Sequence, residues 1–335
     1  MAALANQVNR LPGLPVYRFD GRTSNRLQNL LPDRWQWNIP VLKRFMNCEA
    51  ELTQSLIETI ERIPPVALAL NPVKDTTSIL ALLHTALDRV LAGSQNPAIA
   101  VGGGIDGWLL VLLLRERGIE LPIYTIVSNL PDYCEWEVTQ AIAAELAIPV
   151  NPVIVNEAAF VAGLDRLVSI AEVPLYNLHP VSRVLLLDTL KASGVDTLIT
   201  GDGADEAFAA RDGDDLLPIY AALHDRFNIR WGSPFVDPEI VASLDPQMRQ
   251  PNKPVLRAIA KGRIPDFQLS APKKPTYTPA MDLSPVADLI FQKRFLEHAG
   301  LSWTPKSIKE QTLLTSLGLL QRCFEQVQPC LIPES

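Results

Sequence analysis

The 335-residue chain has little cysteine, little histidine and no long apolar run. Its four cysteines form no C-x-x-C pair and its four histidines do not cluster, so the sequence offers neither a zinc site nor a disulfide framework. The longest apolar run, Trp108 to Leu114, is far shorter than the roughly 20 residues that span a bilayer. Residues 1–9 lack the apolar segment of a signal peptide. These absences predict a cytoplasmic protein with no membrane span.

Positive charge is also scarce, because 30 Lys and Arg residues stand against 37 Asp and Glu residues, a formal net charge of −7. An acidic chain lacks the basic surface that general nucleic-acid binding needs, so we expect no nucleic-acid partner. Hydrophobic residues make up 47% of the chain, which is enough for the core of one large domain or two unequal ones.

The first part of the chain shows little regular periodicity. Apolar spacing predicts a helix over 41–63, and a short apolar run predicts a strand over 66–70. We therefore expect an N-terminal accessory segment over 1–70 and a main domain over 71–335.

From residue 97 onward, expected strands and helices alternate. The strands are expected at 98–101, 123–127, 153–155 and 197–200, and the helices between them at 105–117, 134–147, 157–171 and 180–193. Further helices are expected at 214–228, 238–244, 253–261, 284–299 and 305–327. This order predicts an α/β fold with a mainly parallel sheet, helices on both faces and a helical C-terminal part.

Two glycine-rich loops directly follow expected strands. The first contains Gly102, Gly103 and Gly104, and Asp106 then falls in the first turn of the next helix. Successive glycines allow backbone N–H groups to point at an anion, and the helix N-terminus adds positive potential. A carboxylate there repels phosphate unless a cation such as Mg²⁺ lies between them. The same glycines are equally compatible with a simple tight turn.

The second loop reads Gly201-Asp202-Gly203-Ala204-Asp205-Glu206. Three carboxylates within five residues at a strand end are costly without a neighbouring cation. Helix capping at 204–210 would explain one or two of these acids but neither glycine. Since ligands bind where the order of parallel strands reverses, the two loops together predict a nucleotide site.

The paired motifs G-G-G-I-D-G and G-D-G-A-D-E resemble those of the asparagine synthase superfamily, the amide-forming branch of the PP-loop ATP pyrophosphatases. That family usually carries S-G-G-x-D-S and G-[ED]-G-x-D-E. Further matches follow in the family's order at 178–183, 233–237, 253–257 and 271–274, so the resemblance extends over about 70–300. It implies an adenine nucleotide alpha hydrolase-like fold.

The resemblance also implies ATP and Mg²⁺ as cofactors. Residues matched to ATP binding are Val101, Gly102, Gly103, Gly104, Asp106, Gly107, Val127 and Gly201. Asp106 and Asp205 match the Mg²⁺ ligands, and Asp202 and Lys273 match the catalytic centre. The implied reaction adenylates a small-molecule or peptide carboxylate, after which ammonia or an amine attacks the acyl carbon and AMP leaves.

The chain departs from this family at several positions. Gly102 and Gly107 replace two serines, and each lost hydroxyl removes a possible phosphate hydrogen bond of about 1.5–3 kcal/mol. Glutamine-dependent members carry a catalytic cysteine after the initiator methionine, whereas Ala2 stands there in this sequence. We therefore expect no glutamine hydrolysis and no glutaminase domain, so nitrogen would come from free ammonia, a substrate amine or a separate donor protein.

Two functions stay open on these residues. One is an ATP-dependent amide-forming ligase, and the other is a non-catalytic paralogue that binds a ligand or acts as a scaffold. A third, another PP-loop activity such as tRNA thiolation or lysidine formation, is disfavoured by the acidic charge and the lack of a zinc-type cysteine set.

Overall fold

The centre of the protein is a five-stranded parallel sheet. A computed structural model describes residues 15–46, 54–63, 72–130, 132–209, 216–270 and 278–327. The strands are β4 (Pro97–Ala100), β5 (Ile123–Ser128), β6 (Asn151–Val155), β7 (Thr197–Ile199) and β8 (Arg230–Gly232). They lie in the order β6-β5-β4-β7-β8, and every neighbouring pair is parallel. The chain builds outward first to one side of β4 and then to the other, so the strand order reverses between β4 and β7.

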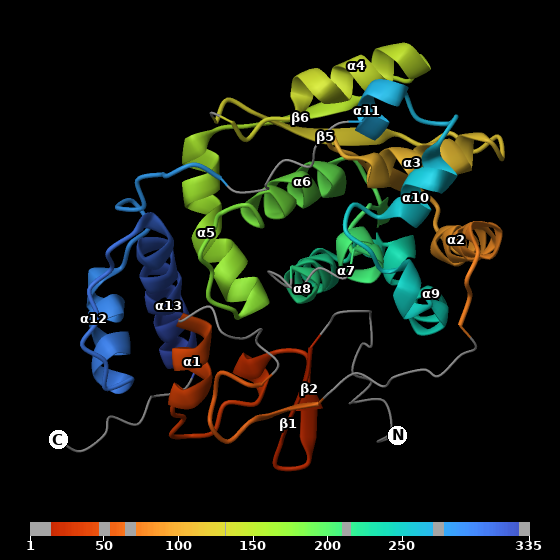
Figure 1. The fold of residues 1–335 in the computed structure, drawn as a ribbon. Helices are drawn as coiled ribbons and strands as arrows, with labels where there is room; N and C mark the ends of the chain where they lie inside the picture. Colours follow the sequence, from red (N-terminus) through yellow and green to blue (C-terminus); the bar gives the residue numbers. More distant parts are fainter. Residues whose placement is uncertain are drawn as a thin grey trace.

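Helices cover both faces of this sheet (Figure 1). One core cluster involves α2 (Thr76–Leu91), α3 (Ile105–Arg115), α4 (Trp136–Leu146) and α10 (Pro254–Ala260). The other involves α5 (Glu157–Ala171), α6 (Val181–Ala192), α8 (Leu217–Phe227) and α13 (Ile308–Val327). Adjacent residues of β7, Leu198 and Ile199, belong to opposite clusters, as pleating requires. The expected α/β fold class is confirmed.

Local sequence signals explain how two of these helices form. Helix α2 begins where the Asp75 carboxylate accepts the Ser78 N–H at 2.8 Å. Helix α3 is buried on all sides, which explains the continuous apolar run from Trp108 to Leu114. In the described ranges, none of the helices combines the length and apolarity needed to span a bilayer.

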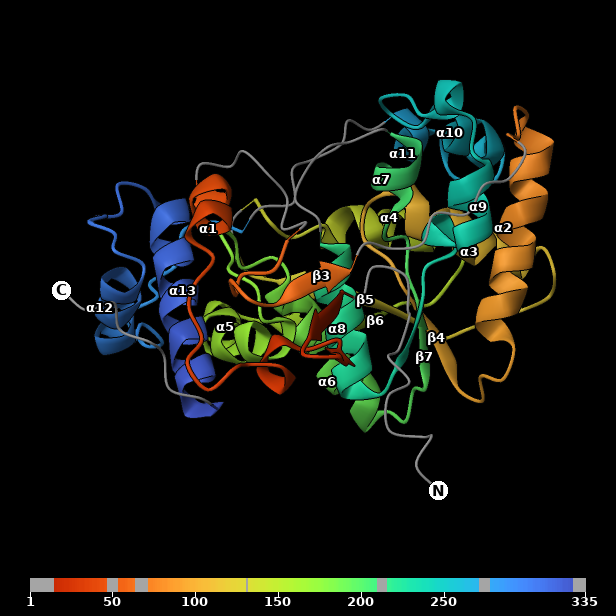
Figure 2. The same cartoon turned by 90° about the horizontal axis from the view of Figure 1, so that it is seen from below.

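The N-terminal segment forms a small antiparallel sheet and packs against the C-terminal helices. The sheet has the order β2-β1-β3, with β1 (Val16–Phe19), β2 (Arg22–Ser24) and β3 (Glu61–Ile63). Helix α1 (Ile39–Met46) lies beside α13 in both Figures 1 and 2. Trp37 Nε1 donates to Gln321 Oε1 of α13 at 2.7 Å. A division of the chain at residue 70 stays a prediction.

The helix expected over 41–63 is present at its start, in helix α1, and wrong at its end. Residues 47–53 lie outside the described residues, and Glu61–Ile63 is strand β3, which pairs with β1. Ile57 forms an isolated bridge with Trp37, and Ile60 is buried in the core. Their spacing of three therefore reflects burial of a turn, in which the Ile60 N–H donates to the Ile57 carbonyl at 3.2 Å, against distant residues. The strand expected at 66–70 lies outside the described residues.

The strands and helices expected from residue 97 onward are present, with ends shifted by a few residues. The later helices include α9 (Pro238–Ser243) and α12 (Leu289–His298), and short helices occur at α7 (Ala204–Phe208) and α11 (Asp266–Ser270). Strand β8 was not expected, because its three residues Arg-Trp-Gly carry no periodic signal.

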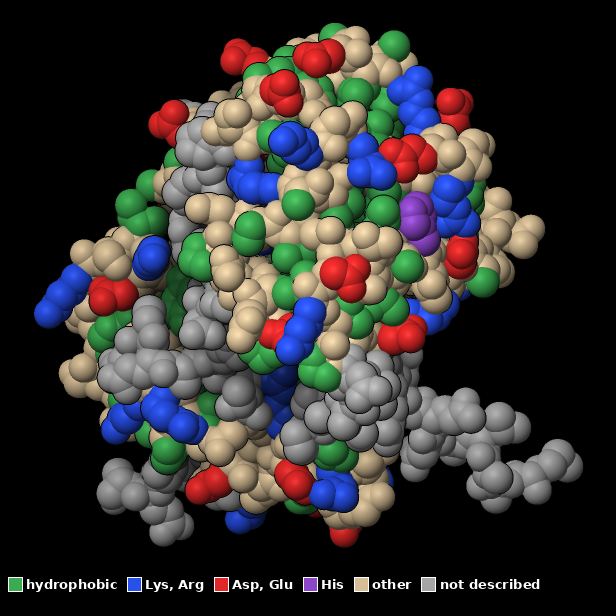
Figure 3. All heavy atoms as spheres, turned by 45° about the vertical axis from the view of Figure 1, so that its right-hand side comes forward, with side chains coloured by type: hydrophobic (Ala, Val, Ile, Leu, Met, Phe, Trp, Pro, Cys, Tyr) green, Lys and Arg blue, Asp and Glu red, His purple; other side chains and the backbone are tan. Residues whose placement is uncertain are grey.

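Oppositely charged side chains are interspersed on the face over α2, α9 and α10 (Figure 3). Ion pairs there join Arg89 to Asp237 and Arg263 to Glu116.

Candidate nucleotide site

The two glycine-rich loops meet at the carboxyl ends of β4 and β7, where the strand order reverses. A Cβ atom added to Gly201 would lie 2.8 Å from the Gly107 nitrogen and 2.9 Å from Asp106 Cβ. Gly203 has a φ of +78°, and a Cβ atom there would lie 2.0 Å from Val236 Cγ1. Close packing leaves no room for a side chain at either glycine of the second loop. Gly201 packs directly against the first loop.

The first loop is held by contacts of its backbone. Trp108, fully buried in α3, donates its indole N–H to the Gly102 carbonyl at 3.0 Å. The Val101 N–H donates to the Tyr124 carbonyl of β5 at 2.9 Å. The Gly103 N–H donates to the Glu135 Oε2 atom at 2.8 Å. A carboxylate thus already lies on one of the backbone donors expected to face phosphate.

The two carboxylates expected to bind Mg²⁺ converge on one lysine. Lys253 Nζ lies 2.5 Å from Asp106 Oδ2 and 2.9 Å from Asp205 Oδ1. The Lys253 side chain is only 7% exposed, and its residue has a φ of +52° at the start of α10. This positive φ is uncommon for a non-glycine residue, so packing of the site holds the lysine in place.

The residues present fit a divalent cation. Asp106 Oδ1 is buried and has no hydrogen-bond partner, and carboxylate oxygens are the ligands that Mg²⁺ prefers. Asp106 and Asp205 would hold the ion. Among the residues that the structure describes, no group of three or more His, Cys, Asp or Glu side chains is arranged around a metal position. The remaining ligands of a Mg²⁺ ion would therefore be water and phosphate oxygens.

Residues 78–228 match the sequence model of the asparagine synthase family. This region is an asparagine synthase-like synthetase domain. Its family comprises ATP-dependent, amide-forming ligases, and the match spans both glycine-rich loops but ends before Lys253 and Lys273. The chain is also similar to the solved structure of NMN synthetase from Francisella tularensis. The two are 14% identical, with coverage of 78% of this chain and 99% of that chain and a TM-score of 0.39. The chain matches no curated protein at a significant level.

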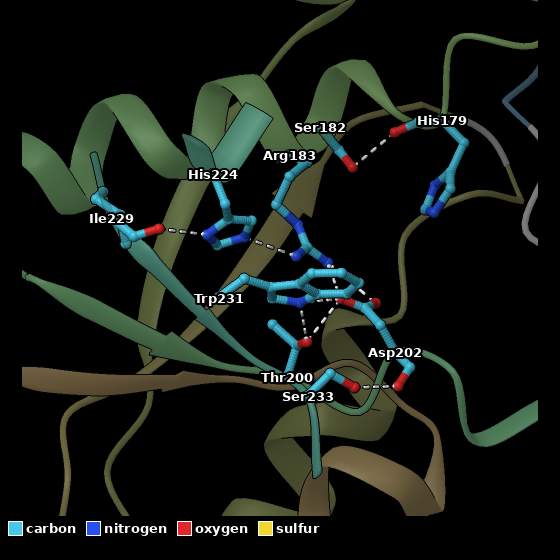
Figure 4. A network of polar contacts seen from close by, with 9 residues as sticks. All are labelled: His179, Ser182, Arg183, Thr200, Asp202, His224, Ile229, Trp231 and Ser233. Carbon is cyan, nitrogen blue, oxygen red and sulfur yellow. Dashed lines mark hydrogen bonds and ion pairs between the residues drawn. The ribbon is translucent and has the colours of Figure 1, made fainter. Parts of the chain in front are cut away.

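In the asparagine synthase-like domain, Asp202 lies at the centre of a polar network (Figure 4). Arg183 of α6 donates to both Asp202 carboxylate oxygens at 3.1 and 2.9 Å, and Thr200 donates its hydroxyl at 2.6 Å. Trp231 of β8 donates its indole N–H at 3.3 Å. Burial opposes ionisation of Asp202, but the Arg183 charge and these hydrogen bonds outweigh it and hold the Asp202 pKa below its usual value. Asp202 is therefore an ionised carboxylate fixed in one orientation.

Two histidines near this network are neutral at neutral pH. His224 Nδ1 donates to the Ile229 carbonyl at 3.0 Å, and its Nε2 faces Arg183 at 3.3 Å. Burial, with the Arg183 charge, lowers the His224 pKa to about 3. Burial and the same arginine lower the His179 pKa to about 4. Both histidines are therefore neutral hydrogen-bonding groups beside the network, and the His179 ring pairs with the Tyr133 hydroxyl at 2.6 Å.

The structure brings most of the expected site residues of this domain together at one sheet edge. Val101 follows β4, Val127 lies near the end of β5, and both loops adjoin them. Lys273 lies outside the described residues.

Glu135 and Lys253 were missed as site residues. Lys253 stood in a matched motif without a role, and Glu135 carried no signal because its contact is with a loop 32 residues earlier. Arg183 also stood in a matched motif, and the structure gives it Asp202 as a partner.

Proposed function

We propose that the chain is an ATP-dependent amide-forming ligase of asparagine synthase type that adenylates a substrate carboxylate. The observation that supports this proposal is the convergence of Asp106 and Asp205 where the two loops pack together. Parallel sheets bind ligands at this point of strand-order reversal, and the family match covers both loops.

The roles we propose follow the resemblance of these motifs to the asparagine synthase family. Backbone groups of Gly102, Gly103, Gly104 and Gly107 would face the phosphates, and Val101, Val127 and Gly201 would line the nucleoside pocket. Asp106 and Asp205 would hold Mg²⁺, which when bound would neutralise phosphate charge. Lys273 would offer a positive charge to the developing negative charge of the reaction.

The proposed reaction has two steps. A substrate carboxylate oxygen attacks the α-phosphorus of ATP, the bond to the β-phosphate breaks, and pyrophosphate leaves. A nitrogen then attacks the acyl carbon of the adenylate, loses a proton and expels AMP, which leaves an amide. The protein contributes positioning and charge neutralisation, and the fixed Asp202 carboxylate is suited to orient an amine through its N–H groups.

The expected substrate is a small-molecule or peptide carboxylate, and the nitrogen would come from ammonia, a substrate amine or a separate donor protein. We place this reaction in the cytoplasm. Glutamine hydrolysis by the chain itself is not part of the proposal.

The test is release of pyrophosphate from MgATP with a panel of carboxylic acids, in the presence and absence of ammonium. We expect release that falls at least about 100-fold in Asp106→Asn and Asp205→Asn, because removal of a charge that positions the phosphates costs several kcal/mol of transition-state stabilisation. Glu137→Gln, an exposed change on the adjacent helix α4, serves as the control. Release that does not depend on Asp106 would contradict the proposal.

One observation favours a second function, a non-catalytic protein that kept the fold. Glu135 occupies a donor of the first loop, and Lys253 pairs with both acids, so these groups have partners within the protein without a ligand. On this proposal, calorimetry shows either no binding of MgATP or binding without release of pyrophosphate.

A further inference from the structure

An internal carboxylate lies where the first loop would receive an anion. Glu135 Oε2 accepts the Gly103 N–H at 2.8 Å, and a Cβ atom added to Gly103 would lie 3.2 Å from Glu135 Cβ. Glu135 immediately precedes α4, which begins after β5, the neighbour of β4 in the sheet. The contact therefore joins the carboxyl ends of two adjacent parallel strands.

This carboxylate and a phosphate cannot use the same donor. Both are negatively charged acceptors, and two such groups on one N–H would repel each other at close range. We propose that Glu135 is an internal anion that occupies the phosphate loop and competes with ATP for it. This inference rests on the proposed ATP site.

The glycine at position 102 is linked to this contact. A Cβ atom at Gly102 would lie 2.7 Å from Glu135 Oε2, closer than side chains approach one another. A side chain there would therefore push the Glu135 carboxylate from its present position and weaken its hydrogen bond to Gly103. Gly102 leaves the space that the Glu135 carboxylate fills, so the loop has exchanged a hydroxyl for an internal carboxylate.

The Glu135 side chain is able to leave. It is only partly buried, and it makes no capping hydrogen bond to the first turn of α4. Its departure would expose the Gly103 N–H to an incoming phosphate without any rearrangement of the sheet. Occupation of the loop by Glu135 thus lowers ATP affinity by the strength of one charge-assisted hydrogen bond plus the repulsion, about tenfold or more.

The test is the affinity for MgATP, measured by calorimetry in the full-length chain. We expect Glu135→Ala to bind MgATP at least about tenfold more tightly than the unaltered protein. Glu135→Gln keeps an acceptor but loses the charge, so it should fall between the two. Glu137→Ala, the next glutamate on α4 and an exposed one, should leave the affinity unchanged.

A second variant approaches the contact from the loop. Gly102→Ser should displace the Glu135 side chain and tighten MgATP binding, and its effect should shrink in the Glu135→Ala background. The Gly103 amide resonance, followed with ¹⁵N-glycine labelling, should move in Glu135→Ala and in Gly102→Ser before any nucleotide is added. This readout reports the contact itself even where one variant folds poorly.

The outcomes separate this inference from the proposed ligase activity. Unchanged or weaker MgATP binding in Glu135→Ala overturns the inference, and Asp106-dependent pyrophosphate release in the same preparation would leave the ligase standing. Tighter binding without pyrophosphate release in any variant supports the inference and contradicts the ligase. Absence of binding in every variant contradicts both.

Discussion

Lys253 is the side chain whose removal tests the charge balance of the site most directly. Its ammonium lies between Asp106 and Asp205, with side-chain exposures of 7%, 20% and 22% respectively. Lys253→Met keeps the length and the apolar stem but removes the ammonium that both carboxylates contact. Removal of one partner from a buried ion pair costs about 3–5 kcal/mol. Because both carboxylates retain some contact with solvent, we expect Lys253→Met to lower the free energy of unfolding by about 3 kcal/mol, the lower end of this range.

The assay is urea denaturation in the presence of a chelator and again with added Mg²⁺. A cation that binds the two carboxylates should recover part of the loss, because a ligand at 100 times its Kd adds about 2.7 kcal/mol to the folded state. Mg²⁺ should therefore stabilise Lys253→Met more than the unaltered protein. Lys261→Met, an exposed change at the end of the same helix, should shift stability by less than about 0.5 kcal/mol.

Two results would refute this reasoning. One is a loss below about 1 kcal/mol in the chelator, which would mean that the carboxylates do not need the lysine charge. The other is equal stabilisation of both proteins by Mg²⁺, which would mean that the Lys253 ammonium and a cation do not compete for Asp106 and Asp205.

Three further predictions concern packing, pH and the Asp202 network. Gly201→Ala should lower the free energy of unfolding by about 1–3 kcal/mol in urea denaturation, because the new Cβ atom meets the Gly107 nitrogen. Gly104→Ala is the control, because nothing lies within 4 Å of a Cβ atom there. An equal loss in the two variants would contradict this reasoning. The His224 pKa falls from 6.5 to about 3 on folding, because the buried imidazole resists protonation. The stability that comes from keeping this imidazole neutral is therefore complete above pH 6.5 and is lost as the pH falls toward 3. The loss is about 5 kcal/mol. His224→Gln should therefore flatten the dependence of the unfolding free energy on pH over that range, and an unaltered slope would count against the assignment. Arg183→Met should lower the free energy of unfolding by about 3 kcal/mol, because it leaves the Asp202 carboxylate without its ion-pair partner. Arg183→Lys keeps the positive charge and should lose less stability. Similar losses in both variants would argue against a role of charge.

Much of the α/β domain could be predicted from the sequence, because most of its helices and strands, β8 excepted, carry their own local signal. Helix α5 has the expected bounds, since Asn156 caps it and its apolar residues recur at helical spacing. The N-terminal sheet could not be predicted in the same way. Its strands are three or four residues long and pair with partners up to 47 residues away, as Val16 does with Ile63.

The sequence by itself determined that two glycine-rich loops follow parallel strands and that these loops carry Asp106, Asp202 and Asp205. Glycine, acid and strand end are all local features, so they can be read along the chain. Only the tertiary structure decided which charged side chains contact these two loops. Lys253 reaches Asp106 from 147 residues away, and Glu135 reaches Gly103 from 32 residues away. Contacts between distant charges leave no periodic pattern in a sequence, because folding alone brings the partners within range.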